Sequence, residues 1–291
     1  MIAAISSWRR SVLGLGIAGA LIVLVGCSGP GVRPATGAAP SETARSGELG
    51  AHVHGAGFNP ADSTLYVATH EGLLRYTEDG PSRVGPAMDL MGFVVAGPDH
   101  FYASGHPGPG QDLPDPVGLL ESTDGGRTWT PLARTGASDF HALAVTSTGI
   151  HGYDGADLLS SPDGGTTWTS TKPPVPIFAM AGANDGQVLL ATSSQGLARA
   201  TDSGLSWQQD PDAPLLQLVH FTTAQLVVGV GPDGVIYLSR DAGTSWAEAG
   251  EAAPAPEALA SWLMPDGQVQ VVVVADGRVL LSADSGLTFT S

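Results

Sequence analysis

Residues 122–129 (STDGGRTW) and residues 161–168 (SPDGGTTW) carry the same eight-residue pattern of Ser, Asp, Gly, Thr and Trp. Two copies with one hydroxyl missing or exchanged follow at residues 200–207 (ATDSGLSW) and 239–246 (SRDAGTSW). A further copy at residues 282–289 (SADSGLTF) ends in Phe. Repetition of one pattern along a chain indicates a repeat architecture, so these segments decide the fold class.

The aspartates of these segments recur at a nearly constant spacing. With a degraded first copy at residues 78–80, their separations are 45, 39, 39, 39 and 43 residues, and they are Asp79, Asp124, Asp163, Asp202, Asp241 and Asp284. Four of the five tryptophans beyond residue 26 end a copy, namely Trp129, Trp168, Trp207 and Trp246. A spacing of about 40 residues is typical of four-stranded propeller blades.

The residue types indicate a structural role for each copy. A short Asp side chain accepts hydrogen bonds from nearby backbone N–H groups, Gly adopts a positive φ, and Ser or Thr hydroxyls join the ends of the hairpin. The Trp is expected to fill space between its hairpin and the neighbouring blade. Calcium binding needs six or more oxygen ligands, and one Asp per loop supplies too few.

These segments resemble the Asp-box, or BNR repeat, of the sialidase-like β-propellers, and the resemblance covers residues 51–291. It implies an all-β fold, a β-propeller of six four-stranded blades, with an irregular seventh blade as the alternative. Short apolar runs at residues 64–69, 187–192 and 268–275 predict strands independently of the resemblance. Bacterial lipoproteins of this repeat class are often labelled glycosyl hydrolase or exo-sialidase-like on the basis of their fold.

The N-terminal segment has the features of an export signal. Arg9 and Arg10 precede an apolar stretch at residues 12–25, and residues 24–27 (LVGC) resemble the lipobox that a lipoprotein signal peptidase cleaves. We therefore expect residues 1–26 to be a signal peptide and Cys27 to carry a lipid. Residues 27–50, rich in Gly, Pro, Ala and Ser, are expected to form a flexible tether to the domain at residues 51–291.

The expected location follows from this signal. The lipid on Cys27 would anchor the chain on the outer side of a bacterial cytoplasmic membrane or at the cell surface. The arginine pair leaves the general secretory and twin-arginine export routes both open.

Charge and cysteine content exclude several classes of protein. The chain has 12 Lys and Arg against 28 Asp and Glu, and after loss of Arg9 and Arg10 its net charge is 10 minus 28, or −18. Lys172 is the single lysine, so the clustered cations that nucleic-acid binding requires are missing. One cysteine, Cys27, forms no disulfide within the chain.

Histidines are the most informative polar residues. When the repeats are aligned, His54 falls level with His141 on first strands, and His70 falls roughly level with His106 after second strands. First strands line the channel of a propeller, and second strands run antiparallel to them, so both positions lie at one mouth. Five histidines are therefore expected to converge there: His52, His54, His70, His106 and His141.

Neutral imidazoles suit Zn, Cu, Ni or Fe, so this cluster predicts a transition-metal site. An anion site, a pH-sensitive patch, or polar channel residues satisfied by water and backbone remain the alternatives. The insertion at residues 105–118 begins at His106, and forms either a stiff rim over the mouth or a plain surface loop. The other three histidines are expected to be ordinary strand or turn residues: His100, His151 and His220.

The resemblance to sialidases also implies a substrate-binding arginine triad, a Tyr nucleophile with a Glu partner, and an Asp acid/base. No arginine falls at a first-strand position here, and residues 52–55 (HVHG) replace the family's arginine-bearing motif. Another glycosidase would need a carboxylate pair. Five acids are candidates near the mouth, but their spacing selects no pair: Glu71, Asp112, Asp115, Asp139 and Asp154.

The sequence thus assigns no catalytic residue. It favours a ligand- or partner-binding or assembly module that uses the histidine-rich mouth, with a bound metal as part of that hypothesis. The alternative is a sialidase-like glycoside hydrolase that acts on cell-envelope or extracellular glycans. Fold alone does not separate the two, because one fold carries many functions.

Overall fold

The computed structural model describes residues 52–291, so the expected signal peptide, Cys27 and tether lie outside the described residues. The described residues belong to one compact unit. Their regular structure consists of strands, and within residues 52–291 no helix is long and apolar enough to cross a membrane.

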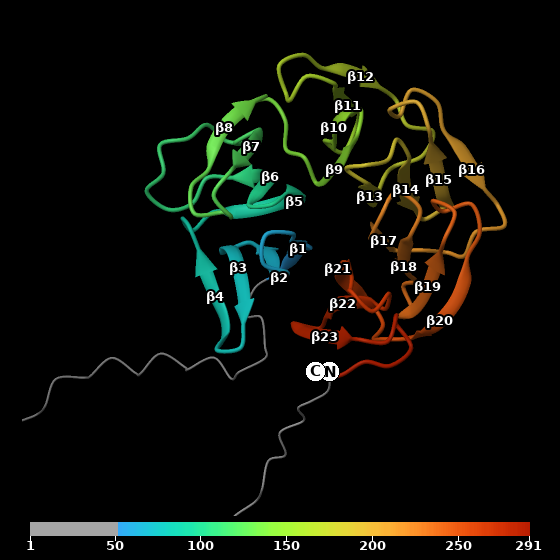
Figure 1. The fold of residues 1–291 in the computed structure, drawn as a ribbon. Coiled ribbons are helices and arrows are strands. Elements are labelled where there is room, and N and C mark those ends of the chain that lie inside the picture. The colour runs from blue at the N-terminus through green and yellow to red at the C-terminus, as the bar shows by residue number, and fades with distance from the viewer. Residues whose placement is uncertain (1–51) are drawn as a thin grey trace, which may run out of the picture. The chain divides into compact units, whose positions relative to one another are not determined.

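The strands form six antiparallel sheets that follow one another around a ring (Figure 1). Blade 1 contains β1 (Val53–Asn59), β2 (Thr64–Thr69), β3 (Gly72–Thr77) and β4 (Gly80–Val84). Blade 2 contains β5 (Asp89–Gly97), β6 (His100–His106), β7 (Leu119–Ser122) and β8 (Thr130–Ala133). Blade 3 contains β9 (Ala142–Thr146), β10 (Gly149–Tyr153), β11 (Leu158–Ser161) and β12 (Thr169–Thr171).

The second half of the ring repeats this order. Blade 4 contains β13 (Ala179–Gly182), β14 (Leu189–Ser193), β15 (Gly196–Ala200) and β16 (Gln208–Asp210). Blade 5 contains β17 (Leu218–Phe221), β18 (Val227–Val230), β19 (Val235–Ser239) and β20 (Ala247–Glu251). Blade 6 contains β21 (Pro256–Leu263), β22 (Val269–Ala275) and β23 (Arg278–Ser282), and a single bridge between Leu281 and Thr290 takes the place of its fourth strand.

The predicted six-bladed propeller is therefore confirmed, and residues 52–291 contain no seventh sheet. Each blade is a continuous stretch of chain in which every strand pairs with its sequence neighbour. All strand partners lie within the described segment, so this segment builds its own core and can be studied by itself.

The repeated Asp segments close hairpins through a shared set of hydrogen bonds. In blade 3, the Ser161 hydroxyl donates to Asp163 Oδ1 at 2.9 Å and accepts from Gly165 N at 2.8 Å. Thr167 donates to the same carboxylate through its backbone N at 2.8 Å and its hydroxyl at 2.7 Å. The segments centred on Asp124, Asp241 and Asp284 repeat these bonds.

The segment at Asp202 differs at one position. Ala200 replaces the serine, so the carboxylate keeps only the two bonds from the backbone N and hydroxyl of Ser206. These contacts are all local in sequence, which explains why the pattern was readable without a structure.

The aromatic residue that ends each segment packs into the apolar cluster between its own blade and the preceding one. Trp168, for example, stacks on Phe140 with ring centroids 5.7 Å apart, in a cluster that includes Leu119 of blade 2 and Leu159 of blade 3. The other aromatics occupy the equivalent interfaces, and they are Trp129, Trp207, Trp246 and Phe289. The expected role of these residues as wedges between blades is thus observed.

Among residues 52–291, side-chain packing closes the ring. Val67 of blade 1 and Val272 of blade 6 lie in one buried cluster between these blades. The degraded first repeat supplies no Trp at this interface, and Trp262 packs there instead, with its ring centroid 6.4 Å from that of Phe58. When the ring closes, blades 1 and 6 cover each other's outward sheet faces. Closure also fixes which strands face the central channel.

We predict that Trp168→Ala lowers the free energy of unfolding by about 2–3 kcal/mol, because it removes half-buried aromatic surface and leaves a gap between two blades. Urea denaturation of residues 43–291 measures the change. Leu205→Ala is the matched control, since Leu205 is 64% exposed in the same kind of hairpin and its truncation should change stability by less than about 0.5 kcal/mol. Equal effects of the two substitutions would contradict the wedge role.

We also predict that the hairpins weaken in acid. Hydrogen bonds from Ser245 lower the pKa of Asp241 to about 2, and those from Thr288 lower the pKa of Asp284 to about 2. A folded-state pKa below the ordinary value of 3.8 means that these bonds stabilise the fold above about pH 4 and are lost as the pH falls through about 2.

Unfolding free energies between pH 4 and pH 2 should therefore fall less steeply in Asp241→Asn than in the unmodified domain. Asp79→Asn is the control, because Asp79 lies in the degraded repeat and accepts none of these hydrogen bonds. An unchanged slope in Asp241→Asn would rule out this source of acid sensitivity.

Candidate functional site: the histidine mouth

Histidines from blade 1 gather where β1 begins and β2 ends. The two strands are paired there, and the backbone N of His70 donates to the carbonyl of His52 at 3.3 Å. The ring of His70 meets that of His52 edge to face at 5.5 Å and that of His54 at 4.5 Å, both measured between centroids. Tight antiparallel pairing thus brings three imidazoles together.

Blade 2 adds a carboxylate to this group. Asp89 is the first residue of β5, and its Oδ2 lies 3.0 Å from Nδ1 of His70. One nitrogen of His54, one of His70 and a carboxylate oxygen of Asp89 all lie within 4.8 Å of one another. His54 Nε2 and Asp89 Oδ1 are buried and have no hydrogen-bond partner among the described residues.

The surroundings of His54 favour its neutral form. Burial is the main cause that lowers its pKa, and the neighbouring His70 lowers it further, while Asp89 opposes the shift. A pKa below 6.5 leaves the imidazole uncharged at neutral pH. This is the form in which histidine donates a lone pair to a metal.

A second group lies beside the first, on blades 2 and 3. His106 ends β6, while Asp139 and His141 immediately precede β9. His141 Nε2 lies 2.7 Å from Asp139 Oδ2, and His106 Nε2 lies 3.4 Å from the same oxygen. The other carboxylate oxygen, Asp139 Oδ1, is buried without a hydrogen-bond partner in the described part of the chain.

The insertion after His106 forms part of the rim. Its Asp115 Oδ1 lies 2.6 Å from His106 Nδ1, and this hydrogen bond is the main cause that raises the pKa of His106, with Asp139 adding to it. Val117 is buried, and its backbone N donates to the carbonyl of Gly105 at 2.9 Å. The insertion is therefore fastened to blade 2 at the mouth.

The pairing of β5 with β6 connects the two histidine groups, because Asp89 of the first group lies directly opposite His106 of the second. We use the name histidine mouth for the following residues: His52, His54, His70, Asp89, His106, Asp115, Asp139 and His141. All five histidines selected from the sequence lie in these two groups, but only His54 and His70 belong to the set of atoms within 4.8 Å. Metal binding by the five remains a prediction.

Sequence reasoning missed Asp89. Met91 falls level with His54 and His141 when the repeats are aligned, and Asp89 stands two residues before Met91, just as His52 precedes His54 and Asp139 precedes His141. Residues two apart on a strand share a face, so this offset was the signal that could have found it.

His220 lies in strand β17, as expected of an ordinary strand residue. It also lines the central cavity, where burial lowers its pKa to about 4. The expectation fits His151, which is buried between Thr146 and Ser160.

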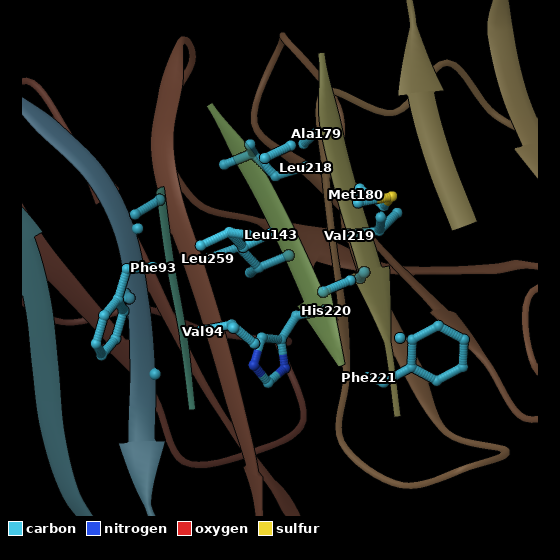
Figure 2. Close-up of a pocket in the computed structure, with 18 of the residues that line it drawn as sticks. Phe93, Val94, Leu143, Ala179, Met180, Leu218, Val219, His220, Phe221 and Leu259 are labelled. Carbon is cyan, nitrogen blue, oxygen red and sulfur yellow. The ribbon is translucent and has the colours of Figure 1, made fainter. Parts of the chain in front are cut away.

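The mouth opens on a central cavity of about 1070 Å³ between the six innermost strands, β1, β5, β9, β13, β17 and β21. His54 and His141 belong to its wall, and Figure 2 shows part of the lining. No Arg or Lys is among the described residues of this wall, so the carboxylate-binding arginine triad of sialidases has no counterpart there. What the mouth offers instead is imidazole nitrogen and carboxylate oxygen.

Comparison with known proteins identifies the fold class and no more. No family model matches the chain, and no curated protein matches it. Among solved structures, a GH74 enzyme from Niastella koreensis aligns with a TM-score of 0.57 at 18% identity, over 84% of this chain and 37% of the enzyme. The extracellular domain of a hybrid two-component system from B. thetaiotaomicron aligns with a TM-score of 0.55 at 13% identity, over 84% of this chain and 34% of that one.

YCF48 bound to a D1 peptide aligns with a TM-score of 0.54 at 13% identity, over 82% of this chain and 96% of YCF48. This chain therefore spans about a third of the first two proteins and nearly all of the third. At these identities the likeness shows a shared β-propeller fold.

For the rim we predict that Asp115→Asn lowers the pKa of His106 in metal-free protein, because the substitution removes the carboxylate that favours the imidazolium. NMR titration of the imidazole protons measures the pKa of His106. The raised pKa means that this contact stabilises the fold fully below about pH 6.5 and is lost as the pH rises through the folded-state pKa. Asp112→Asn, in the same insertion, is the control. A pKa of His106 that falls in Asp112→Asn but not in Asp115→Asn would contradict the geometry.

Proposed function

We propose that this chain is an exported, lipid-anchored propeller of the Asp-box repeat class, which binds a ligand or partner through a transition-metal site in its histidine mouth. The observation that carries the proposal is the pair of buried, unpartnered ligand atoms, His54 Nε2 and Asp89 Oδ1, beside His70. A buried polar atom without a partner costs about 1–3 kcal/mol. Coordination of one ion would satisfy both atoms.

The donor set suits a borderline metal. Two imidazoles and one carboxylate are the ligands of many catalytic Zn²⁺ sites and of non-haem Fe²⁺ sites, which keep coordination positions open for a further ligand. Within the described residues, His54, His70 and Asp89 form the one group of three or more His, Cys, Asp or Glu side chains whose ligand atoms lie within 4.8 Å. Small side-chain rotations would bring these atoms to bonding distance of an ion.

Supporting residues surround the proposed ligands. His52 packs against the ring of His70, and Asp89, itself a proposed ligand, also contacts Nδ1 of that ring. Contacts of this kind orient metal-binding histidines. His54 also belongs to the cavity wall, so a molecule that enters the channel passes the proposed metal. Binding of a small ligand, glycan or protein segment at the mouth would then depend on the metal.

The second candidate function is glycoside hydrolysis on cell-envelope or extracellular glycans. Its support is the presence of Asp89 and Asp139 at one mouth of a fold that GH74 enzymes share. Each carboxylate already contacts histidine. A panel of fluorogenic glycosides tests this role directly, and turnover that disappears in Asp139→Asn but survives metal removal would favour it over the metal proposal.

We predict that residues 43–291, produced without a chelating tag, bind one Zn²⁺ per chain when reconstituted. His54→Ala and Asp89→Asn should each weaken binding by about 100-fold or more, because each removes one of three ligands. Metal analysis after dialysis and competition with a chromophoric chelator measure stoichiometry and affinity.

His100→Gln is the matched control, because His100 contacts Glu121 on blade 2 and lies outside the histidine mouth. Absence of stoichiometric Zn, Cu, Ni or Fe, or binding that survives both ligand substitutions, would refute the proposal.

A further inference from the structure

The mouth of the channel differs between the two halves of the ring. Blades 1–3 place imidazole and carboxylate groups there. In blade 4, Phe178 stands immediately before β13, as His141 stands immediately before β9, and it is 60% exposed. In blade 5, Leu215 stands three residues before β17 and is 54% exposed. The two strands begin at Ala179 and Leu218, which Figure 2 shows at the same end of β13 and β17.

Buried neighbours hold these apolar side chains outward. Ile177 is buried in the core, whereas Pro176 and Phe178 on either side of it are exposed. Leu216 is likewise buried beside the exposed Leu215. Successive side chains of an extended segment point to opposite faces, so burial of one directs the next toward solvent. The exposed residues are therefore displayed by the packing of the links between blades.

The links on this side of the mouth are rich in proline. The three stretches contain seven prolines: residues 172–178 (KPPVPIF), 211–217 (PDAPLLQ) and 252–256 (AAPAP). The link before blade 3, residues 134–141 (RTGASDFH), contains none. Proline fixes φ, so these links are stiff. A stiff surface loses little conformational entropy when a partner binds, which favours docking.

Hydrogen bonds join the three links side by side. The backbone N of Phe178 donates to the carbonyl of Thr192 at 2.8 Å, and the Thr192 hydroxyl donates to the carbonyl of Gln217 at 2.7 Å. Gln217 Nε2 donates in turn to the carbonyl of Pro256 at 2.6 Å. The exposed apolar residues of the links thus lie on one connected surface. We use the name proline face for the following residues: Pro176, Phe178, Leu215 and Pro254.

The charge beside the proline face is negative. Asp212 lies in the second of these links and is exposed, and Glu251, also exposed, directly precedes the third. Lys172 begins the first link, but its ammonium group already contacts Asp157. The chain as a whole has 28 Asp and Glu against 12 Lys and Arg. A partner that complements this surface therefore carries positive charge beside its apolar groups.

The extent of the proline face favours a polypeptide as its occupant. The face runs over the links of three blades, so a molecule that contacts all of it needs several side chains in a row. Exposed apolar residues within a polar surround mark protein interaction sites. Aromatic residues such as Phe178 commonly supply much of the binding energy at such sites.

We propose that the proline face docks a partner polypeptide segment in which large apolar side chains are flanked by Lys or Arg. Phe178 and Leu215 contact the apolar side chains, and Asp212 and Glu251 attract the cations. The face uses none of the proposed metal ligands. Docking therefore goes beyond the proposed metal site, and each can fail without the other.

The test uses residues 43–291 in buffer with EDTA and a phage library of random twelve-residue peptides. We expect the selected peptides to contain two or more large apolar residues and a net positive charge. A fluorescein-labelled copy of the most enriched peptide then measures affinity by fluorescence polarisation. Enrichment of acidic peptides, or of no sequence above background, would overturn the proposal.

Substitutions on exposed positions locate the docking surface. Phe178→Ser and Leu215→Ser should each weaken peptide binding at least about tenfold, because each removes an apolar contact. Leu287→Ser is the matched control, since Leu287 is 59% exposed in the hairpin at the other end of blade 6, and it should bind as the unmodified domain does. Circular dichroism establishes that each variant is folded. Unchanged affinity in Phe178→Ser and Leu215→Ser, or an equal loss in Leu287→Ser, would refute the site.

The attraction of cations has its own readout. In the unmodified domain, peptide affinity should fall as the salt concentration rises, and Asp212→Asn combined with Glu251→Gln should make this fall less steep. Affinity that does not depend on salt would overturn the role of these carboxylates.

Two further measurements separate the other possible occupants. Sedimentation equilibrium detects self-association, and flotation detects binding to vesicles of phosphatidylcholine and phosphatidylglycerol. We expect neither for residues 43–291. Self-association or vesicle binding that disappears in Phe178→Ser would identify a second copy or a lipid surface as the occupant, and would overturn the polypeptide proposal.

Discussion

Packing of blade 6 against blade 1 is the contact on which the rest of the molecule depends. Every other interface between blades joins consecutive segments and receives an aromatic wedge from a hairpin. The closing interface joins the two ends of the domain, and relies on apolar side chains such as Val67 and Val272, with Trp262. Once the ring is closed, six first strands face one channel, and their starts lie at one mouth.

Closure and register together explain the histidine mouth. Equivalent positions of successive blades lie side by side around the channel, so His54 and Asp89 meet from two neighbouring blades, and His106 and His141 meet Asp139 in the next group. Imidazole and carboxylate groups lie at the mouth, and the neutral ring of His220 lies in the cavity wall beside the hydroxyl of Ser261.

The fold could be predicted from the sequence because its signal is local. Asp163 and its equivalents bind atoms within four residues, so each hairpin leaves a complete pattern in the chain, and the spacing of the patterns gives the blade count. The convergence of His54 and His70 also followed from alignment of the repeats. Asp89 was not predicted, although it occupies a position aligned with His52 and Asp139.

Other features of the site depend on more than pattern. β17 has only four residues, and which of them face the channel is set by its register with β18, so the orientation of His220 was not readable from the chain. The absence of hydrogen-bond partners at His54 Nε2 and Asp89 Oδ1 among the described residues depends on how blades 1 and 2 pack. The signal peptide and lipid attachment at Cys27 remain predictions from the sequence.

The central claim is that the histidine mouth binds a metal through His54, His70 and Asp89. An anomalous-diffraction map from crystals of residues 43–291 grown with Zn²⁺ tests it most directly. The account predicts one anomalous peak with two nitrogen ligands and one carboxylate oxygen at about 2.0–2.2 Å, from these three side chains. A peak held by His106 and His141, or no peak at the mouth in a crystal that contains the ion, would contradict the account.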